Sequence, residues 1–282
     1  MTENKTGQEV SSGEMEDVLN EETCRRWLDT AWAGNYLEVY HEIDSTNRRA
    51  KQLGEEGAPH GALVAADSQT AGKGRRGRSW VTPAGSALAF SLLLRPSIPV
   101  DRVSMLTLVA ALAVSRAIDE LAGIRTGIKW PNDIVYERRK LCGILTEMST
   151  DGTQIRYALV GIGVNVHMKE FPQELQDKAL SLAMTGGPVP ERARLLGRIL
   201  HWFEIGYRQL EEDGDLHRMK QEYESRMAGR NDLVSIREGD QERIGTCLGI
   251  TEMGAMRISF ADGLDEEIIA GEVSVRGLYS YI

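Results

Sequence analysis

The stretch that decides the fold is IKWPNDIVYERRKLCGILTEMSTDGTQIRYALVGIGVNV, residues 128–166. It contains strand-like runs rich in β-branched and other apolar side chains at residues 128–136, 141–148 and 157–166. Short polar turns at residues 137–139 and 149–152 separate these runs. Strands joined by such short turns pair antiparallel, so the stretch predicts the centre of a mixed or antiparallel sheet.

Helices and further strands are predicted on both sides of this centre. The spacing of apolar residues predicts helices over residues 23–33, 46–53, 102–121, 191–212 and 215–227. Strands are predicted over residues 37–43, 61–67 and 86–94. Because the strands and helices alternate irregularly, residues 36–228 should form an α+β domain, a mixed sheet flanked by helices.

The predicted secondary structure changes from long helices to short strands after residues 228–229. Five short strands separated by glycines follow, over residues 233–237, 243–250, 255–260, 266–270 and 272–276. Such a run predicts a small all-β barrel over residues 229–282. The remaining segment, residues 1–35, is predicted to be an acidic, frayed leader followed by the short helix.

Composition excludes several classes of protein. The chain has 282 residues and a net charge of −9, and 41% of its residues are hydrophobic, as in ordinary globular proteins. Its longest mainly apolar stretch, residues 105–114, is too short to span a bilayer. The first 22 residues carry seven acids and one lysine and lack the apolar core of a secretory signal. We therefore expect a cytoplasmic protein that has no membrane partner.

A DNA partner is not expected either. The pI of about 5.2 argues against general affinity for nucleic acid, which depends on a basic surface. About 35 residues precede the first predicted strand, too few for a three-helix DNA-binding domain. Cys24, Cys142 and Cys247 lie far apart and predict three reduced thiols rather than a disulfide framework or a metal site.

The first candidate site is AGKGRRGR, residues 71–78, with four cations and three glycines. Glycine lets the backbone approach an anion closely, and arginine offers forked donors that match phosphate oxygens. The spacing is not that of a Walker A loop. A solvated basic turn or a nucleic-acid patch would have the same composition, but the apolar strands on either side and Trp80 directly after favour a loop that closes over a polyphosphate.

The second candidate site follows Pro131, which should mark an edge, a bulge or a bend in the strand. Asn132 and Asp133 come next, and their oxygens suit a divalent cation attached to phosphates, although an Asn-Asp turn that bonds its own backbone is the alternative. Lys140 is either a cation held beside a substrate carboxylate or a solvated hairpin residue. Cys142 is more simply a packing residue than a nucleophile.

Two further stretches are weaker signals. Ser45 and Thr46 open a predicted helix, where their hydroxyls either cap the helix or point toward a ligand. In GIGVNV, residues 161–166, the glycines permit close approach of a ligand and Asn165 interrupts an apolar run.

Taken in order, these stretches resemble the biotin–protein ligase family of the BirA type, from about residue 37 to residue 279. AGKGRRGRSW and KWPNDIVYERRKLCGIL carry the resemblance, and Lys73 stands where the family has arginine. The resemblance implies a mixed sheet with helices, like that of class II aminoacyl-tRNA synthetases, and a C-terminal SH3-like β-barrel. Some members carry an N-terminal DNA-binding domain, and we expect this chain to lack it.

The implied activity has two steps. Biotin and MgATP give biotinyl-5′-AMP and pyrophosphate, and a lysine of a biotin carboxyl carrier protein, part of a biotin-dependent carboxylase, then takes the biotinyl group. A homodimer is also implied. The alternatives are a lipoate or octanoyl ligase, which shares the fold, and a biotin-sensing or nucleic-acid-binding regulator without ligase activity.

The resemblance also implies roles for individual residues. Lys140, Arg75 and Arg76 would be catalytic. The implied biotin contacts are Ser45, Thr46, Asn47, Gln69, Lys73, Arg75, Lys140 and Gly143. The implied nucleotide contacts are Gly72, Gly74, Arg76, Trp80, Lys129, Asn132, Asn165 and Arg276, with Trp80 stacking on adenine. Asn132 and Asp133 would hold Mg²⁺ through ATP, and residues 72–78 should become ordered when biotin or the adenylate binds.

Overall fold

A computed structural model describes residues 17–80, 82–238, 241–269 and 274–277, the last four and residue 238 by their backbone alone. A seven-stranded sheet forms the larger part. Its strands are β1 (Leu37–Ile43), β2 (Leu63–Gln69), β3 (Ala87–Leu94), β4 (Gly127–Lys129), β5 (Asp133–Tyr136), β6 (Arg139–Asp151) and β7 (Gln154–Asn165). The order is β1-β2-β3-β7-β6-β5-β4, in which β1 and β2 pair parallel and the other neighbours antiparallel. The predicted mixed sheet is confirmed.

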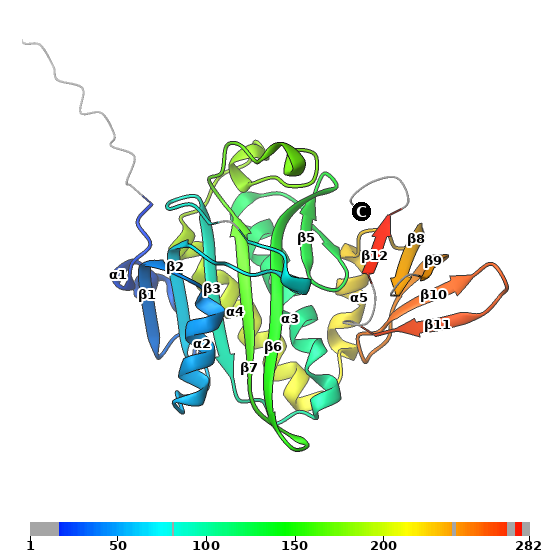
Figure 1. Cartoon of the computed structure of the whole chain (residues 1–282), viewed down its shortest axis with the longest axis horizontal. Coiled ribbons are helices and arrows are strands. Elements are labelled where there is room, and N and C mark those ends of the chain that lie inside the picture. The colour runs from blue at the N-terminus through cyan, green and yellow to red at the C-terminus, as the bar shows by residue number, and fades with distance from the viewer. Residues whose placement is uncertain (1–16, 81, 239–240, 270–273, 278–282) are drawn as a thin grey trace, which may run out of the picture.

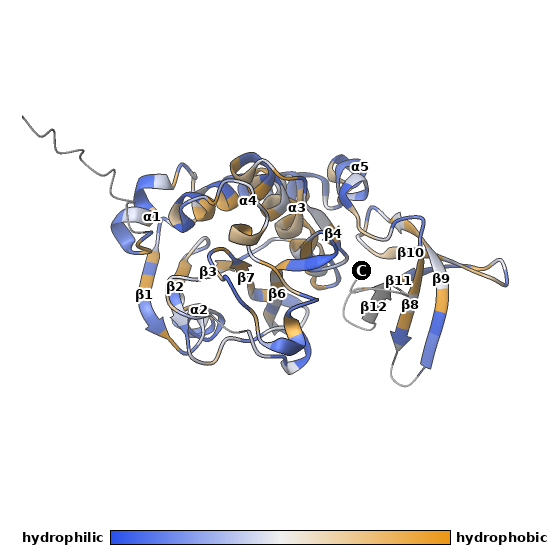
Figure 2. Ribbon diagram, turned by 90° about the horizontal axis from the view of Figure 1, so that it is seen from above, coloured by the Kyte–Doolittle hydropathy of each residue, from blue (hydrophilic) through white to orange (hydrophobic). Residues whose placement is uncertain are grey.

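Helices cover both faces of this sheet (Figures 1 and 2). The long helices α3 (Ser104–Ala122) and α4 (Arg192–Asp213) pack on one face together with α1 (Glu21–Trp27), while α2 (Thr46–Glu55) lies on the other. Short 3-10 turns occur at Arg75–Gly77, Val100–Arg102, Gln173–Leu175 and Leu182–Met184. In the described part of the chain, no helix combines the length and the hydropathy that crossing a bilayer requires.

A second sheet follows, with the order β11-β10-β9-β8-β12 and all neighbours antiparallel. Its strands are β8 (Leu233–Glu238), β9 (Gln241–Ile250), β10 (Met256–Phe260), β11 (Asp265–Ile268) and β12 (Ser274–Gly277). It stands beside the main sheet at the C-terminal end of the chain (Figure 1). The expected small C-terminal β domain of the SH3-like kind is confirmed.

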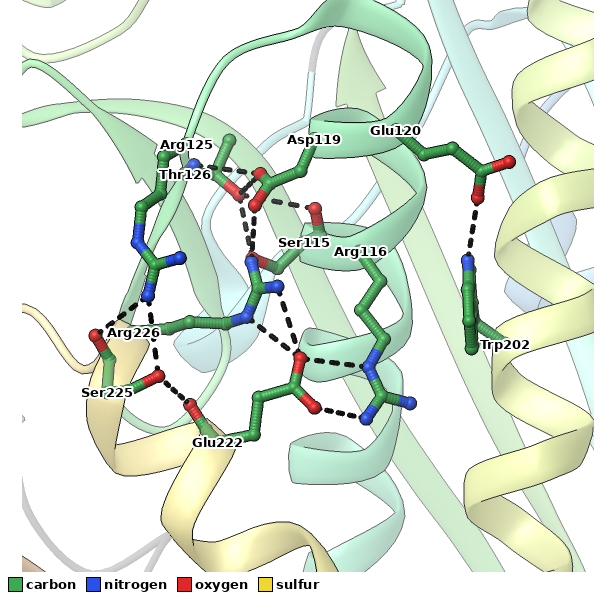
Figure 3. Close-up of polar contacts among 10 residues, drawn as sticks. All are labelled: Ser115, Arg116, Asp119, Glu120, Arg125, Thr126, Trp202, Glu222, Ser225 and Arg226. Atoms are coloured by element: carbon green, nitrogen blue, oxygen red, sulfur yellow. Dashed lines mark hydrogen bonds and ion pairs between the residues drawn. The ribbon is translucent and has the colours of Figure 1, made fainter.

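Helix α5 (His217–Arg226) joins the two parts. Arg226 bonds Asp119 at 2.5 Å and Ser115 at 2.9 Å on α3, and Glu222 of α5 pairs with both Arg226 and Arg116 (Figure 3). Two residues along from Glu222, on the other side of the helix, Glu224 accepts a hydrogen bond from the Ile250 amide of β9 at 3.1 Å. Ion pairs on one side of α5 and a backbone contact on the other therefore fix the β domain relative to the main sheet.

One predicted strand is wrong in detail. Residues 128–136 form a hairpin of β4 and β5, paired antiparallel, rather than one strand. The chain turns at Pro131, which has no N–H to donate to a ladder. Of the three alternatives for Pro131, the bend is the one observed.

The N-terminal helix is shorter than predicted. It ends at Trp27 rather than near residue 33. The amides of Ala31, Trp32 and Ala33 donate instead to the buried carboxylate of Glu204 on α4, at 2.7–2.9 Å. These long-range hydrogen bonds replace the ones that a continued helix would have made.

The frayed-leader prediction is wrong for residues 17–22. Asp17 bonds the guanidinium and the backbone amide of Arg192, a side chain that is only 1% exposed, and lies 2.6 Å from His167. Burial by itself would raise the pKa of Asp17, but the His167 hydrogen bond and the Arg192 charge outweigh it and lower that pKa. The end of the leader is thus held against the start of α4, and residues 1–16 lie outside the described part.

Candidate functional site

Four stretches that are far apart in the sequence line one cavity on the α2 face of the sheet. The cavity has about 450 Å³ of empty space, counting the part open to solvent. Its walls come from the start of α2, the segment after β2, the β5–β6 hairpin and β7, with β3 as floor. The lining residues are Ser45, Thr46, Asn47, Gln69, Lys73, Gly74, Arg75, Trp80, Phe90, Asn132, Lys140, Gly143, Ile144, Leu145, Gly161, Ile162 and Gly163.

A hydrogen-bonded row of polar side chains begins at the start of α2. Ser45 is the N-cap residue, yet its hydroxyl makes no capping bond, so the ligand-facing alternative fits it better. The amide and hydroxyl of Thr46 donate to Gln69 Oε1 at 2.9 and 3.2 Å, and Gln69 Nε2 donates to Thr82 at 3.2 Å. These bonds hold a set of donors and acceptors in fixed orientations at the cavity wall.

Asn47 is fixed by two residues that the sequence reasoning missed. Its amide nitrogen donates to Glu147 at 2.7 Å, and the Ser91 hydroxyl donates to its carbonyl oxygen at 2.5 Å. A Cβ on Gly161 would lie 2.1 Å from that same oxygen. Ser91 had a signal in the sequence, because it is the one polar residue in the apolar run ALAFSLLL. Glu147 had none, since its partner lies a hundred residues away.

Lys140 points into the cavity because of a bulge. Ile134 pairs with Cys142 and Val135 with Lys140, so one residue of β6 is extra at this point. The bulge interrupts the alternation of side chains between the two faces of the sheet. The ammonium of Lys140 therefore lies next to Gly143. There it lies 2.7 Å from Asp133 Oδ1 and 5.7 Å from the ring centroid of Trp80. The alternative of a solvated hairpin lysine does not hold.

The glycine-rich segment folds over the cavity. Gly74 N donates to Arg78 O at 2.7 Å and Trp80 N to Gly72 O at 2.9 Å, which closes it into a tight loop. A Cβ on Gly72 would lie 2.4 Å from Trp80 O. Lys73, Gly74 and Arg75 reach the cavity wall. The alternative of a basic turn surrounded by solvent does not fit Gly74 and Arg75, which are half-buried, whereas Lys73 is exposed.

Within the loop, the two central arginines differ. Arg75 donates to Asn132 Oδ1 at 2.8 Å, and its burial lowers its pKa although the nearby Asp133 charge opposes this. Arg76 is exposed, has a backbone φ of 57°, and is not part of the cavity lining. Only Arg75 is positioned at the cavity in this arrangement.

Trp80 lies against two glycines. Cβ atoms on Gly163 and Gly143 would come within 2.5 and 3.3 Å of its indole. The indole nitrogen is buried and has no hydrogen-bond partner among the described residues. Gly143 and Gly163 thus leave room for the side chain of Trp80, and because both also line the cavity, close approach of a ligand there stays a prediction.

Asn132 ends the turn of the β4–β5 hairpin and Asp133 begins β5. Asn132 Nδ2 donates to Ile144 O at 3.0 Å and to Asp133 Oδ1 at 3.1 Å. In the described part of the chain no three His, Cys, Asp or Glu side chains form a metal cluster. With one carboxylate, itself paired to Lys140, the site fits a cation that arrives on phosphates better than a resident metal ion.

Several expected residues are not part of the cavity lining. Lys129 stands opposite Asp133 in the β4–β5 ladder. Asn165 is buried and donates to Leu180 O at 3.1 Å. Arg276 pairs with Ser235 through its backbone, and its side chain lies outside the described residues. Cys142 is buried, which raises the pKa of its thiol far above the ordinary value and confirms a packing role.

Comparison with known proteins gives consistent matches. The model of the biotin/lipoate A/B protein ligase family matches residues 39–165. The bifunctional ligase/repressor BirA of Bacillus subtilis is 39% identical over 249 residues, which are 87% of this chain and 76% of that protein. The biotin–[acetyl-CoA-carboxylase] ligase of Mycobacterium tuberculosis is 30% identical over 262 residues, 90% of this chain and 95% of that protein. The structure of the biotin protein ligase from Aquifex aeolicus in complex with biotin and ATP is similar with a TM-score of 0.76 at 32% identity, over 86% of this chain and 99% of that one.

Proposed function

The chain belongs to the biotin/lipoate A/B protein ligase family, and from this premise we propose that its cavity activates biotin with ATP and passes the biotinyl group to a lysine of a carrier protein. The observation that carries the proposal is the composition of the cavity wall. Polar groups of Ser45, Thr46, Asn47 and Gln69 share it with the ammonium of Lys140 and with the basic residues Lys73 and Arg75 of the loop. The apolar lining residues are Phe90, Ile144, Leu145 and Ile162.

Biotin has the matching chemistry: a compact polar ureido ring, an apolar body and a carboxylate at the end of an aliphatic chain. A pocket for such a ligand needs a few fixed donors and acceptors within apolar walls. Ser45, Thr46, Asn47 and Gln69 would bind the ring, helped by Lys73 in the loop. Lys140, next to Gly143, would bind the carboxylate.

In the first step, a carboxylate oxygen of biotin attacks the α-phosphorus of ATP and the bond to pyrophosphate breaks. Two anions must meet, so the principal barrier is electrostatic. Lys140 would hold the carboxylate, and Arg75 would stabilise charge on the phosphate. Mg²⁺ bound to the phosphates would neutralise further charge near Asn132 and Asp133. Trp80 would stack on adenine, and Arg76, Lys129 and Arg276 stay nucleotide-site predictions.

In the second step, the amine of the acceptor lysine attacks the acyl carbon, AMP leaves, and a proton is released. The biotin–[acetyl-CoA-carboxylase] ligases among the relatives act on a biotin-dependent carboxylase. The acceptor here would be the carrier domain of such an enzyme. An acyl adenylate hydrolyses readily, so the loop at residues 72–78 would shield it until the carrier docks. Biotin should therefore reduce cleavage of that loop by a protease.

One assay tests the activity. The protein is incubated with ATP, biotin and a carrier domain, and biotin transfer is read on a streptavidin blot, with lipoate in place of biotin as the control. Efficient transfer of lipoate but not of biotin would favour the lipoate ligase alternative. Transfer of neither would favour a regulator without ligase activity.

A second assay tests the site. Lys140→Ala should slow adenylate formation at saturating substrates about 100-fold or more, since one transition-state charge contact is lost. A rate near that of the unmodified protein would refute the role given to Lys140.

A further inference from the structure

The backbone of Lys140 is held by a segment from a distant part of the chain. The ladder between β6 and β7 has its last pair at Cys142 and Val164. Two residues earlier along β6, Lys140 N donates to Lys178 O at 2.7 Å, and Leu180 N donates to Lys140 O at 3.0 Å. Residues 178–180 thus replace β7 as the neighbour of β6 at the point where the bulge aims Lys140 into the cavity.

Asn165, the last residue of β7, holds this segment in turn. Its amide nitrogen donates to Leu180 O at 3.1 Å, and both residues are buried, at 4% and 0% exposure. A buried carbonyl that loses its donor incurs a desolvation penalty, so this bond strongly favours one placement of the segment. Two further bonds fix the start of the segment, where the amides of Lys178 and Ala179 donate to Leu175 O at 2.9 and 2.8 Å.

We propose that Asn165 is a positioning residue: its amide fixes residues 178–180, and these fix the backbone of Lys140 and so the aim of its ammonium. The chain of contacts is Asn165 to Leu180 to Lys140 to the cavity. This role differs from the adenine contact that the family resemblance suggests for Asn165. It rests on the proposed function, because Lys140 is the residue that acts.

The test is a double-mutant cycle on the rate of adenylate formation, measured in a single turnover at saturating biotin and ATP. Asn165→Leu keeps the branched shape of the side chain and removes the donor. It should lower the rate about tenfold in the unmodified protein and less than twofold in the Lys140→Ala background. Binding of a non-hydrolysable ATP analogue should stay within twofold. Thr185→Ala, which removes a side-chain bond to Leu182 elsewhere in the same loop region, should leave the rate unchanged.

The outcomes separate the two proposals. If Lys140→Ala alone leaves the rate unchanged, the proposed function of Lys140 fails. If Lys140→Ala is slow but Asn165→Leu lowers the rate equally in both backgrounds, or weakens the ATP analogue instead, the positioning role is overturned. Should Asn165→Leu not fold, Asn165→Ser, whose hydroxyl is too short to reach Leu180, takes its place in the same cycle.

Discussion

Lys140 Nζ lies 2.7 Å from Asp133 Oδ1, with side-chain exposures of 25% and 13%. This lysine of the cavity wall is therefore paired with a carboxylate of the protein itself. A substrate carboxylate that reaches Lys140 must share the ammonium with Asp133 or displace it. The pair sets how strongly the cavity attracts an anion, since each partner offsets the charge of the other.

Asp133→Asn should separate the binding of biotin from its activation. Removing the competing anion should leave biotin affinity equal or up to a few-fold higher, because Lys140 then attracts the biotin carboxylate more strongly. Adenylate formation should fall about tenfold or more, because the proposed phosphate-side carboxylate is lost. Calorimetric titration with biotin alone and a pyrophosphate-release assay measure the two effects. A tenfold loss of biotin affinity would contradict the prediction.

Two alanine substitutions on β7 should each affect the binding of a different substrate. In Gly161→Ala the new Cβ lies 2.1 Å from Asn47 Oδ1, and in Gly163→Ala it lies 2.5 Å from the Trp80 indole. Gly161→Ala should therefore raise the KM for biotin, and Gly163→Ala the KM for ATP, each by about tenfold or more, which corresponds to at least about 1.4 kcal/mol. Steady-state kinetics of both variants give the result. An equal loss for both substrates in both variants would indicate general disruption of the strand.

Protonation of the Glu38 carboxylate should make the protein less stable in acid. The pKa of Glu38 is lowered to about 2, chiefly by hydrogen bonds from Arg49. Arg49 Nε donates to Glu38 Oε2 at 2.8 Å. In the unfolded chain the pKa is about 4.3, so the stabilising contribution is complete above that value and is lost as the pH falls from about 4 through 2.

Glu38→Gln should therefore lower the free energy of unfolding by about 1–2 kcal/mol at pH 7, a figure reduced for partial solvent screening. The difference between the two proteins should shrink as the pH falls below 4. Urea unfolding at pH 7 and near pH 3 measures it. A difference that is constant with pH would show that the carboxylate charge is not responsible.

Arg226→Met should destabilise the junction between α3 and α5. It removes bonds to Ser115 and Asp119 and one of the two cations next to Glu222 (Figure 3). Breaking a largely buried ion pair costs about 3 kcal/mol, seen as a lower urea midpoint. Arg125→Met is the matched control, because among the described residues Arg125 hydrogen-bonds Ser225 alone, at 3.4–3.5 Å. Its loss should cost less than about 0.5 kcal/mol. Similar losses in both variants would contradict this account.

Much of the fold follows from local patterns. The strand at Leu37–Ile43 was predicted with its observed bounds, and the helix at Ser104–Ala122 to within two residues. Strand and helix periodicities can be recognised locally in the sequence. They predict the fold correctly here because the apolar residues that give the periodicity are the ones buried in the folded protein. Two of the predictions that failed involve distant partners. Glu204 takes the amides that would have continued the first helix, and Arg192 holds Asp17 against α4.

The residues of the candidate site also divide into those that the sequence indicated and those that only the structure shows. Composition alone indicated the glycine-bounded cations at residues 71–78, Trp80 directly after them, and Lys140. The family resemblance then implied the individual roles of Arg75 and Trp80. Glu147 and the Lys178–Leu180 support of Lys140 had no signal in the sequence, since each acts on a residue more than thirty positions away. Residue types set which chemistry is available. Where an ammonium or an amide points depends on a bulge and on hydrogen bonds between remote segments, and those exist only after the chain has folded.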